Sequence, residues 1–246
     1  MDSLTAPFKF HNTSIMIMRK LLLLLPAAIA LASPVSAVQI NWGCEVDSVL
    51  RDSFGNPLDG TFAIQLGYFE SVLGVAFVPD ATNIADWSSR WKVFDQAAFD
   101  PSSGYFTSSA LLMADGSSTG SFASSGPGMD FSNQDAYIWI FDSKIAAPGS
   151  EWFLGRSATA GGWRLPAKPA DDCCDTAVLE WSVTDLTTND TPVFGRQGVP
   201  QGAGEKTVTS PSYTLQTFSV VPEPSSCLLL TLGGVMAAFR RRRPES

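Results

Sequence analysis

The stretch Thr61-Phe62-Ala63-Ile64-Gln65-Leu66-Gly67-Tyr68-Phe69 carries the clearest secondary-structure signal in the chain. Every second position holds a large apolar side chain: Phe62, Ile64, Leu66 and Tyr68. Strict two-residue alternation is typical of a β-strand that turns one face toward a core. Residues 53–60 before it are dense in turn formers, so residues 46–51 and 61–69 are predicted to pair as a hairpin.

The same alternation of short strands and turns continues along residues 38–221, where no useful helical period appears. Further strands are predicted at 38–42, 104–113, 136–141, 151–156, 177–183 and 213–220. The strands at 136–141 and 151–156 flank a turn at 147–150 and are predicted to form a second hairpin. The pattern favours an all-β domain, a single β-sandwich of jelly-roll or Greek-key type. Helix is expected only as a turn near residues 87–94, and residues 117–128 and 194–207 are expected to be loops.

Residues 1–37 have the composition of a secretory signal peptide. A basic pair, Arg19-Lys20, precedes an apolar stretch, and small residues close the segment. Cleavage by signal peptidase is predicted after Ala37, which makes Val38 the new N-terminus of a chain exported through the general secretory translocon. The residues before Met16 are long for such a leader, so we interpret Met16 or Met18 as the start; an N-terminal membrane anchor is the alternative.

The end of the chain, residues 222–246, combines Pro222-Glu223-Pro224, an apolar run at 227–239 and an arginine cluster. The cluster consists of Arg240, Arg241, Arg242 and Arg243. As a helix with a rise of about 1.5 Å per residue the run is about 20 Å long, shorter than a hydrocarbon core of about 30 Å. The arginines favour a cytoplasmic C-terminus, with the bulk of the protein across the membrane. We therefore predict a short membrane helix that anchors poorly.

This tail resembles the PEP-CTERM sorting signal of Gram-negative bacteria, which some ice-binding proteins also carry. The resemblance implies recognition, and cleavage near Pro-Glu-Pro, by a membrane cysteine peptidase called exosortase. It also implies transient residence in the inner membrane, delivery to the cell surface or beyond, and a link to extracellular polysaccharide. The alternative is a plain C-terminal anchor. The body of the chain resembles uncharacterised exported proteins, which implies no activity.

The charge and histidine content of residues 38–221 narrow the function classes. Nine Lys or Arg stand against 21 Asp or Glu, a net charge of −12, which disfavours nucleic-acid partners. The sole histidine, His11, lies upstream of the leader, so Ser-His-Asp and Cys-His catalysis and His-ligated zinc are excluded from the exported domain. Carboxylate-only chemistry, a Ser-Lys dyad or no catalysis remain.

Several residues are candidates for a disulfide, a glycan surface or a metal site. A disulfide is predicted from Cys44 to Cys173 or Cys174, with a vicinal bond or free thiols as alternatives.

Three tryptophans in core-like strands (Trp139, Trp152, Trp181) are expected to be buried, and three in loop-like surroundings (Trp87, Trp91, Trp163) are the candidate glycan contacts. Two acidic turns (Asp52, Asn56, Asp59 and Asp171, Asp172, Asp175) could bind calcium but lack the EF-hand order, so we expect turn-forming roles and no metal or cofactor. The candidate carboxylates for glycoside hydrolysis are Glu70, Glu151 and Glu180.

The sequence therefore predicts a non-enzymatic cell-surface or extracellular-matrix protein handled by an exosortase-like peptidase. The alternative is a glycan-binding module, or a carboxylate-dependent glycan-active enzyme, delivered by the same system.

Overall fold

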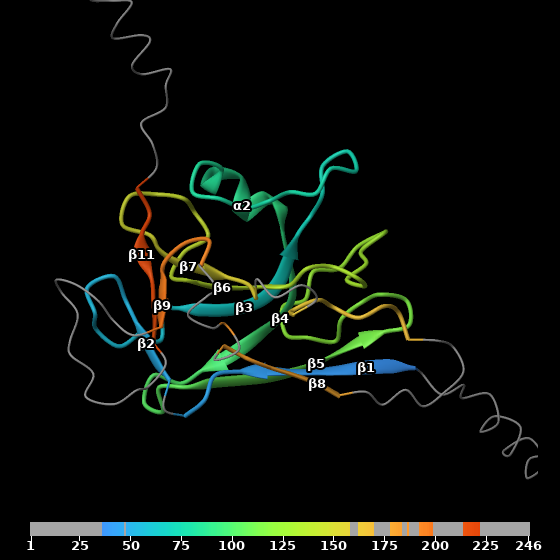
Figure 1. Cartoon of the computed structure of the whole chain (residues 1–246), viewed down its shortest axis with the longest axis horizontal. Coiled ribbons are helices and arrows are strands. Elements are labelled where there is room, and N and C mark those ends of the chain that lie inside the picture. Colours follow the sequence, from blue (N-terminus) through green and yellow to red (C-terminus); the bar gives the residue numbers. More distant parts are fainter. Residues whose placement is uncertain are drawn as a thin grey trace, which may run out of the picture. The chain divides into compact units, whose positions relative to one another are not determined.

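The computed structural model of the protein describes residues 36–46, 48–157, 162–169, 178–183, 186, 192–198 and 214–221 (Figure 1). The chain divides into two compact units, Met1–Val35 and Ser36–Ser246, and every described residue belongs to the second. Most of the leader, the pair Cys173 and Cys174, and the tail 222–246 lie outside the described residues, so the predictions made for them stay predictions.

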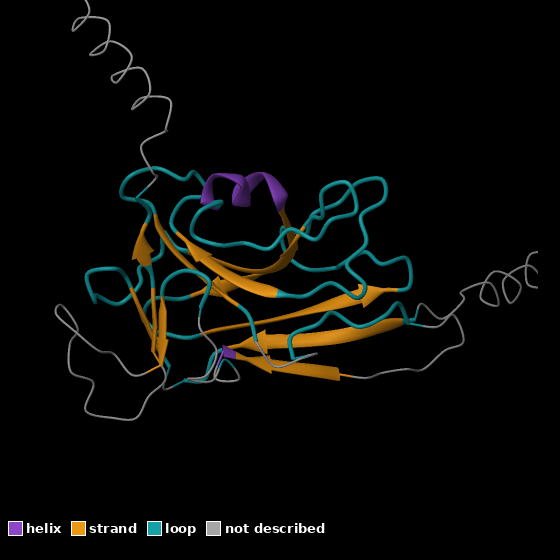
Figure 2. Ribbon diagram, turned by 45° about the horizontal axis from the view of Figure 1, so that its top comes forward, coloured by secondary structure: helices purple, strands orange, loops and turns teal. Residues whose placement is uncertain are grey.

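The described part of the chain is built almost entirely from strands, which confirms the predicted all-β class (Figure 2). Its elements are β1 (Ala37–Gly43), β2 (Val49–Arg51), β3 (Ala63–Phe69), α2 (Ile84–Arg90), β4 (Trp91–Phe99), β5 (Phe106–Met113), β6 (Tyr137–Phe141), β7 (Glu151–Gly155), β8 (Val178–Ser182), β9 (Arg196–Gly198), β10 (Thr214–Gln216) and β11 (Phe218–Ser219). Within these described residues, no helix has the length and apolar character needed to cross a membrane.

The strands form one curled sheet of order β11-β7-β6-β3-β4-β5-β1-β8 and a small sheet of order β2-β10-β9. The long strand β4 belongs to both halves of the curled sheet: it pairs with β3 over most of its length and with β5 through its last two residues. In Figure 1, β5, β1 and β8 lie on one side, β3, β6 and β7 lie above them, and α2 covers the far face of that second layer. The arrangement differs from the predicted sandwich because one strand runs through both layers.

A β-bulge in β4 allows this strand to serve two layers. Leu66 pairs with Asp95 and Gly67 with Val93, which leaves Phe94 without a partner on β3. An extra residue reverses the faces to which the following side chains point. Trp91 and Val93 therefore pack in one hydrophobic cluster, whereas Ala97, which would share their face in a regular strand, packs with Phe94 in the other.

Two hydrophobic clusters cover the two faces of β3, β6 and β7. The inner cluster fills the space between the layers and includes Ile40, Trp42, Ile64, Leu66, Phe94, Phe106, Ile138, Ile140 and Phe153. The aromatic cluster lies beneath α2 and consists of Phe69, Trp87, Trp91, Val93, Tyr137, Trp139, Phe141, Trp152, Leu154 and Val220. Because both faces are covered, every residue of β6 and β7 is buried.

The strands predicted at 38–42, 61–69, 104–113, 136–141, 151–156 and 177–183 are confirmed as β1, β3, β5, β6, β7 and β8. Ile64, Leu66 and Tyr68 lie in the inner cluster with Phe62 packed against them, and β6 and β7 form the predicted hairpin. The other hairpin prediction is wrong, because β4 and β6 occupy both edges of β3 and β2 pairs instead with β10. The sequence also missed β4, of which residues 91–94 were expected to be helical, and β9, which falls in the expected loop 194–207.

The serine-rich segment 117–128 runs along the edge of β4 that faces away from β3. Ser124 donates its backbone N–H to the carbonyl of Val93 at 2.8 Å, and the Val93 N–H donates to the Ser124 hydroxyl at 2.9 Å. A Cβ at Gly120 would lie 2.3 Å from the Phe94 carbonyl oxygen, so only glycine fits there. This expected loop therefore continues the sheet where β4 and β5 separate.

A buried carboxylate joins the two layers at the bulge. Asp95, 1% exposed, accepts the indole N–H of Trp42 on β1 at 2.7 Å. It also accepts the backbone N–H groups of Ser121 at 2.8 Å and of Gln96 at 2.9 Å. Three donors satisfy the charge that burial would otherwise make costly.

Replacing this carboxylate is expected to destabilise the fold. Asp95→Asn turns an acceptor into a group that also presents N–H toward three donors, so the free energy of unfolding should fall by about 1–3 kcal/mol. The matched control is Asp100→Asn, at an exposed turn after β4, which should cost less than about 0.5 kcal/mol. Urea unfolding measures both, and equal losses for the two variants would contradict the role assigned to Asp95.

Exposed turns of one kind recur between the strands: an aspartate whose carboxylate accepts bonds from a Ser or Thr two residues later. They begin at Asp59, Asp80, Asp100, Asp115 and Asp130. At Asp59 and Asp80 the side-chain bond from the threonine is the main cause that lowers the carboxyl pKa below its ordinary value, and the threonine N–H adds to it. The serine at position 102 lowers the pKa of Asp100 in the same way.

These turns predict a loss of stability in acid. A carboxyl whose pKa is lower in the folded state makes its full contribution to the stability of the fold above its ordinary pKa of about 3.9. That contribution is lost as the pH falls through the lower pKa of the folded state. Thr61→Val and Thr82→Val each remove a hydrogen bond to an ionised carboxylate, so the free energy of unfolding of these variants should depend less on pH below about 4. The control is Ser89→Ala, because the Ser89 hydroxyl donates to a backbone carbonyl and its loss should not change the pH dependence. Urea midpoints across this pH range test this, and an unchanged acid slope in the threonine variants would refute it.

Candidate functional site

The described chain leaves the fold beside the first residues of β7. β11 pairs there, with Phe218 opposite Trp152 and Ser219 opposite Glu151, and the Val220 N–H donates to the Ser150 carbonyl at 2.6 Å. Val220 is fully buried in the aromatic cluster, whereas Val221 is 80% exposed. The predicted sorting residues Pro222, Glu223, Pro224 and Arg240 to Arg243 follow this point and lie outside the described residues. The predicted sorting segment therefore follows directly after Val221, the last residue that the structure describes.

At the other end, the predicted signal-peptidase site coincides with the start of β1. Ala37 is the first residue of the strand and pairs with Met113, while Val38 is buried and pairs with Leu112. A cut after Ala37 would thus leave a chain whose first residue belongs to a paired strand.

Cys44 follows β1 and is half-buried. Its sulfur accepts the Phe106 N–H at 3.3 Å, and burial raises the pKa of its thiol. Because Cys173 and Cys174 lie outside the described residues, the disulfide stays a prediction.

The tryptophans predicted to contact glycans are buried in this structure, which corrects that interpretation. Trp87 of α2 stacks on Trp152 with ring centroids 5.6 Å apart, and Trp91, the first residue of β4, donates its indole N–H to Gln65. Trp163 stacks on Trp181, with 5.8 Å between centroids and 9° between planes. Rings that lie inside the core have no free face for a sugar, and their loop-like sequence surroundings gave no sign of the layer that covers them.

The candidate catalytic carboxylates lie in three different environments. Glu151 is buried and accepts bonds from the Ser53 N–H (2.9 Å), the Ser53 hydroxyl (2.6 Å) and the Thr217 hydroxyl (2.7 Å), which tie the small sheet to β7. Glu70 pairs with Lys92 at 2.9 Å. Glu180 lines a surface depression of about 400 Å³ with Glu45 and Trp181.

The acidic turn predicted as a calcium candidate uses its oxygens internally. Asp52 accepts the N–H groups of Phe54 and Asn56 and the Asn56 side-chain amide, and Asp59 accepts Thr61. In the described ranges, no three His, Cys, Asp or Glu side chains gather as a metal site would require. Asp171, Asp172 and Asp175 lie outside those ranges.

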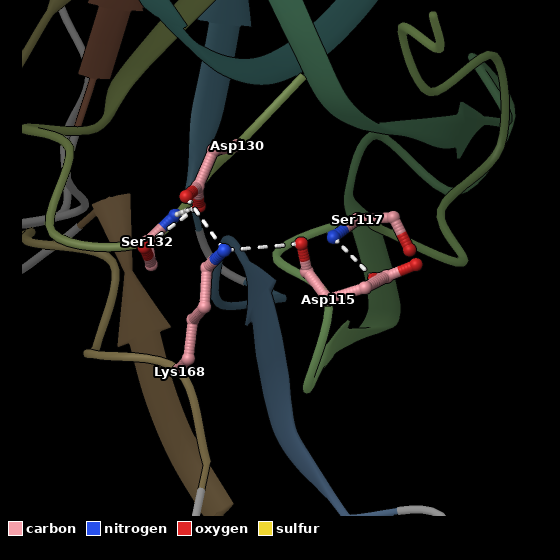
Figure 3. Close-up of polar contacts among 5 residues, drawn as sticks. All are labelled: Asp115, Ser117, Asp130, Ser132 and Lys168. Carbon is pink, nitrogen blue, oxygen red and sulfur yellow. Dashed lines mark hydrogen bonds and ion pairs between the residues drawn. The ribbon is translucent and has the colours of Figure 1, made fainter. Parts of the chain in front are cut away.

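The polar site that the structure assembles was not predicted from the sequence. It is a pocket of about 400 Å³ lined mainly by Asp115, Ser117, Ser124, Met129, Asp130 and Lys168. Figure 3 shows Lys168 between two aspartate turns, one following β5 and one preceding β6: its ammonium donates to the Asp115 backbone carbonyl at 3.2 Å and pairs with the Asp130 carboxylate at 2.8 Å. A Cβ at Gly116, where φ is +87°, would lie 2.4 Å from an Asp130 oxygen, so this approach requires glycine.

The carboxylates of this pocket are held in their ionised form. Partial burial alone would raise the pKa of Asp130, but bonds from Lys168 and Ser132 outweigh it and bring the pKa below its ordinary value. The Ser117 hydroxyl and N–H lower the pKa of Asp115. The pocket presents charged and hydroxyl groups suited to a small, hydroxyl-rich ligand.

Comparison with known proteins finds a family motif near the end of the chain. No curated protein and no solved structure matches the chain. Residues 220–243, which start at the last buried residue and include Pro222-Glu223-Pro224 and the arginine cluster, match one family model. The chain therefore carries a PEP-CTERM protein-sorting motif at residues 220–243.

Proposed function

We propose that this protein is a non-catalytic cell-surface or extracellular-matrix component whose tail is a single-use sorting device. The motif implies export and sorting to the surface by an exosortase-type system, in which the processing enzyme is a membrane protein. In the proposal, the leader is removed after Ala37, the segment 227–239 holds the chain briefly in the inner membrane, and the peptidase cuts near Pro222-Glu223-Pro224.

The observation that carries this proposal is the position of the motif relative to the packed chain. Val220 is the last of the described residues that is buried, and Val221 is exposed. A peptidase needs an accessible, extended substrate, and the Pro-Glu-Pro segment follows directly after the exposed residue. Cleavage there removes no residue that contributes to either hydrophobic cluster as described.

Processing of the tail can be followed by mass. Full-length protein expressed in a Gram-negative host with an exosortase-type peptidase should reach the outer fraction without most of residues 222–246, because the membrane segment must be released for transfer. Intact-mass spectrometry of the inner-membrane and outer fractions measures this. A full-length C-terminus in the outer fraction would overturn the proposal.

The arginine cluster provides the control for that experiment. Replacing Arg240 to Arg243 by glutamine should leave unprocessed protein in the cells, since the positive charge sets the orientation of the segment. Replacement by lysine keeps the charge and should preserve processing.

A second candidate function, glycan binding, is favoured by the pocket around Lys168. Its lining combines an ammonium, two carboxylates and serine hydroxyls, which are groups able to bond sugar hydroxyls. Lys168 has three N–H donors, of which two are directed to Asp115 and Asp130. The third can serve a ligand in the pocket.

Glycan binding predicts a specific mutant difference. In a glycan screen and in titrations with the oligosaccharide selected, with and without calcium, Lys168→Gln should weaken binding by about tenfold, or about 1.4 kcal/mol. Lys92→Gln, which breaks the comparable surface ion pair with Glu70, should leave affinity unchanged. Absence of any glycan ligand, or equal affinities of the two variants, would exclude this pocket as a glycan site.

A further inference from the structure

Exposed apolar side chains gather around the edge of the aromatic cluster. We call Val72, Leu73, Val75, Val78, Ile145 and Val221 the apolar rim; all are exposed, with Leu73 fully so. Their chain neighbours connect the rim to the cluster, because Phe77, Ala146 and Val220 pack in it. Figure 1 places the connection from β3 to α2, α2 itself and the end of β11 on one side, and β5, β1 and β8 on the other. The rim therefore occupies a single side of the described fold.

The tip of the rim is a tight turn with an unusual residue. The N–H groups of Val72 and Val75 each donate to the other's carbonyl, at 2.9 and 2.8 Å, and Leu73 and Gly74 between them have φ of +50° and +79°. Two positive φ values define a type I′ turn, which prefers Asn-Gly or Asp-Gly. A leucine here is strained, because its Cβ crowds the following carbonyl at positive φ, and its side chain is fully exposed. The side chain at this tip is thus not explained by folding.

Basic side chains surround the same cluster, although the domain as a whole is acidic. Arg90 lies over Phe77, Lys144 over Phe141, Arg156 over Tyr137 and Arg196 over Phe218, with 5.0–5.7 Å from the charged group to the ring centroid. Residues 38–221 as a whole carry a net charge of −12. Aromatic rings flanked by arginine and lysine, with apolar tips beyond them, match the chemistry of a membrane interface.

The tail limits how far this side can be from a bilayer. Five residues, 222–226, separate Val221 from the apolar segment that starts at Cys227. Fully extended at about 3.6 Å per residue they span at most about 18 Å. If the segment enters the membrane, the rim lies near the headgroups.

From these observations we infer that the apolar rim docks on the bilayer surface while the protein is held by its tail. The partner is the lipid itself: the rim side chains insert at the headgroup level, and Arg90, Lys144, Arg156 and Arg196 face the phosphates. This inference rests on the proposed function, because it needs the tail in the membrane. Docking would hold the Pro-Glu-Pro segment at the membrane surface, where an exosortase-type peptidase works.

The test uses the full chain in vesicles of phosphatidylethanolamine with a minority of phosphatidylglycerol. A photoreactive benzophenone side chain is placed at Leu73 or Ile145 and, as the control, at Val46, which is 77% exposed against 73% for Ile145 and follows β1. After flotation and illumination, mass spectrometry should find severalfold more lipid adduct at Leu73 and Ile145 than at Val46. No other protein is present, so an adduct reports lipid or a second copy of the chain.

A substitution that stabilises the turn distinguishes an effect on docking from an effect on folding. Leu73→Asn creates the preferred Asn-Gly pair, so the protein should remain folded and unfold at equal or higher urea concentration. The same variant should lower lipid labelling from Ile145 severalfold, because the rim loses its tip. Val46→Asn should not change this labelling.

Each outcome bears on one of the two proposals. Protein that floats with the vesicles but labels lipid equally at Leu73, Ile145 and Val46 overturns docking and leaves the sorting proposal intact. Protein that does not float overturns both, because the tail is then not in the bilayer. Adducts mainly between two copies of the chain would also overturn docking and would assign the rim to self-association.

Discussion

The hydrogen bond from the Trp42 indole to the Asp95 carboxylate joins the two layers where β4 changes the direction of its side chains. Without the bulge at Phe94, Asp95 and Ala97 would lie on the same face of β4 as Trp91 and Val93, away from Trp42 and the inner cluster. A buried carboxylate with three donors favours one register of β4 over its neighbours, because any shift would leave charge or N–H groups unsatisfied. The curl of the large sheet, and with it the position of both clusters, depends on this point.

The two-sided burial that follows determines which surfaces remain for function. The second layer is covered by the inner cluster on one face and by α2 with the aromatic cluster on the other. The tryptophans predicted to be exposed, Trp87, Trp91 and Trp163, are therefore part of the core. The polar pocket forms from turns at the edge of the fold, where Lys168 pairs with Asp130. Exposed apolar side chains remain at the rim, and the rim residue Val221 lies within the sorting motif.

The sequence predicted local features well and tertiary ones poorly, for a physical reason. The alternation in residues 61–69, the hairpin of β6 and β7 and the sorting motif are each readable within a window of neighbouring residues. The bulge at Phe94 interrupts the two-residue period of β4, so the sequence of this strand lacks the regular alternation from which a strand is predicted. Burial of Trp163 depends on Trp181, and the pocket depends on segments around residues 115, 130 and 168. Spacing along the chain carries no record of such contacts.

Val220 is the last of the described residues that is buried, and the motif residues Pro222-Glu223-Pro224 follow two residues later. A cut after Val221 would leave both clusters complete as described. What such a cut would change is the environment of the rim. In the docking that we propose, Leu73 and Ile145 face lipid only while the tail holds them there, and after release the same apolar side chains face water. The free energy of docking would then oppose release, so delivery would require a weak rim, and a few exposed side chains around a turn bind a bilayer less strongly than a broad apolar face would.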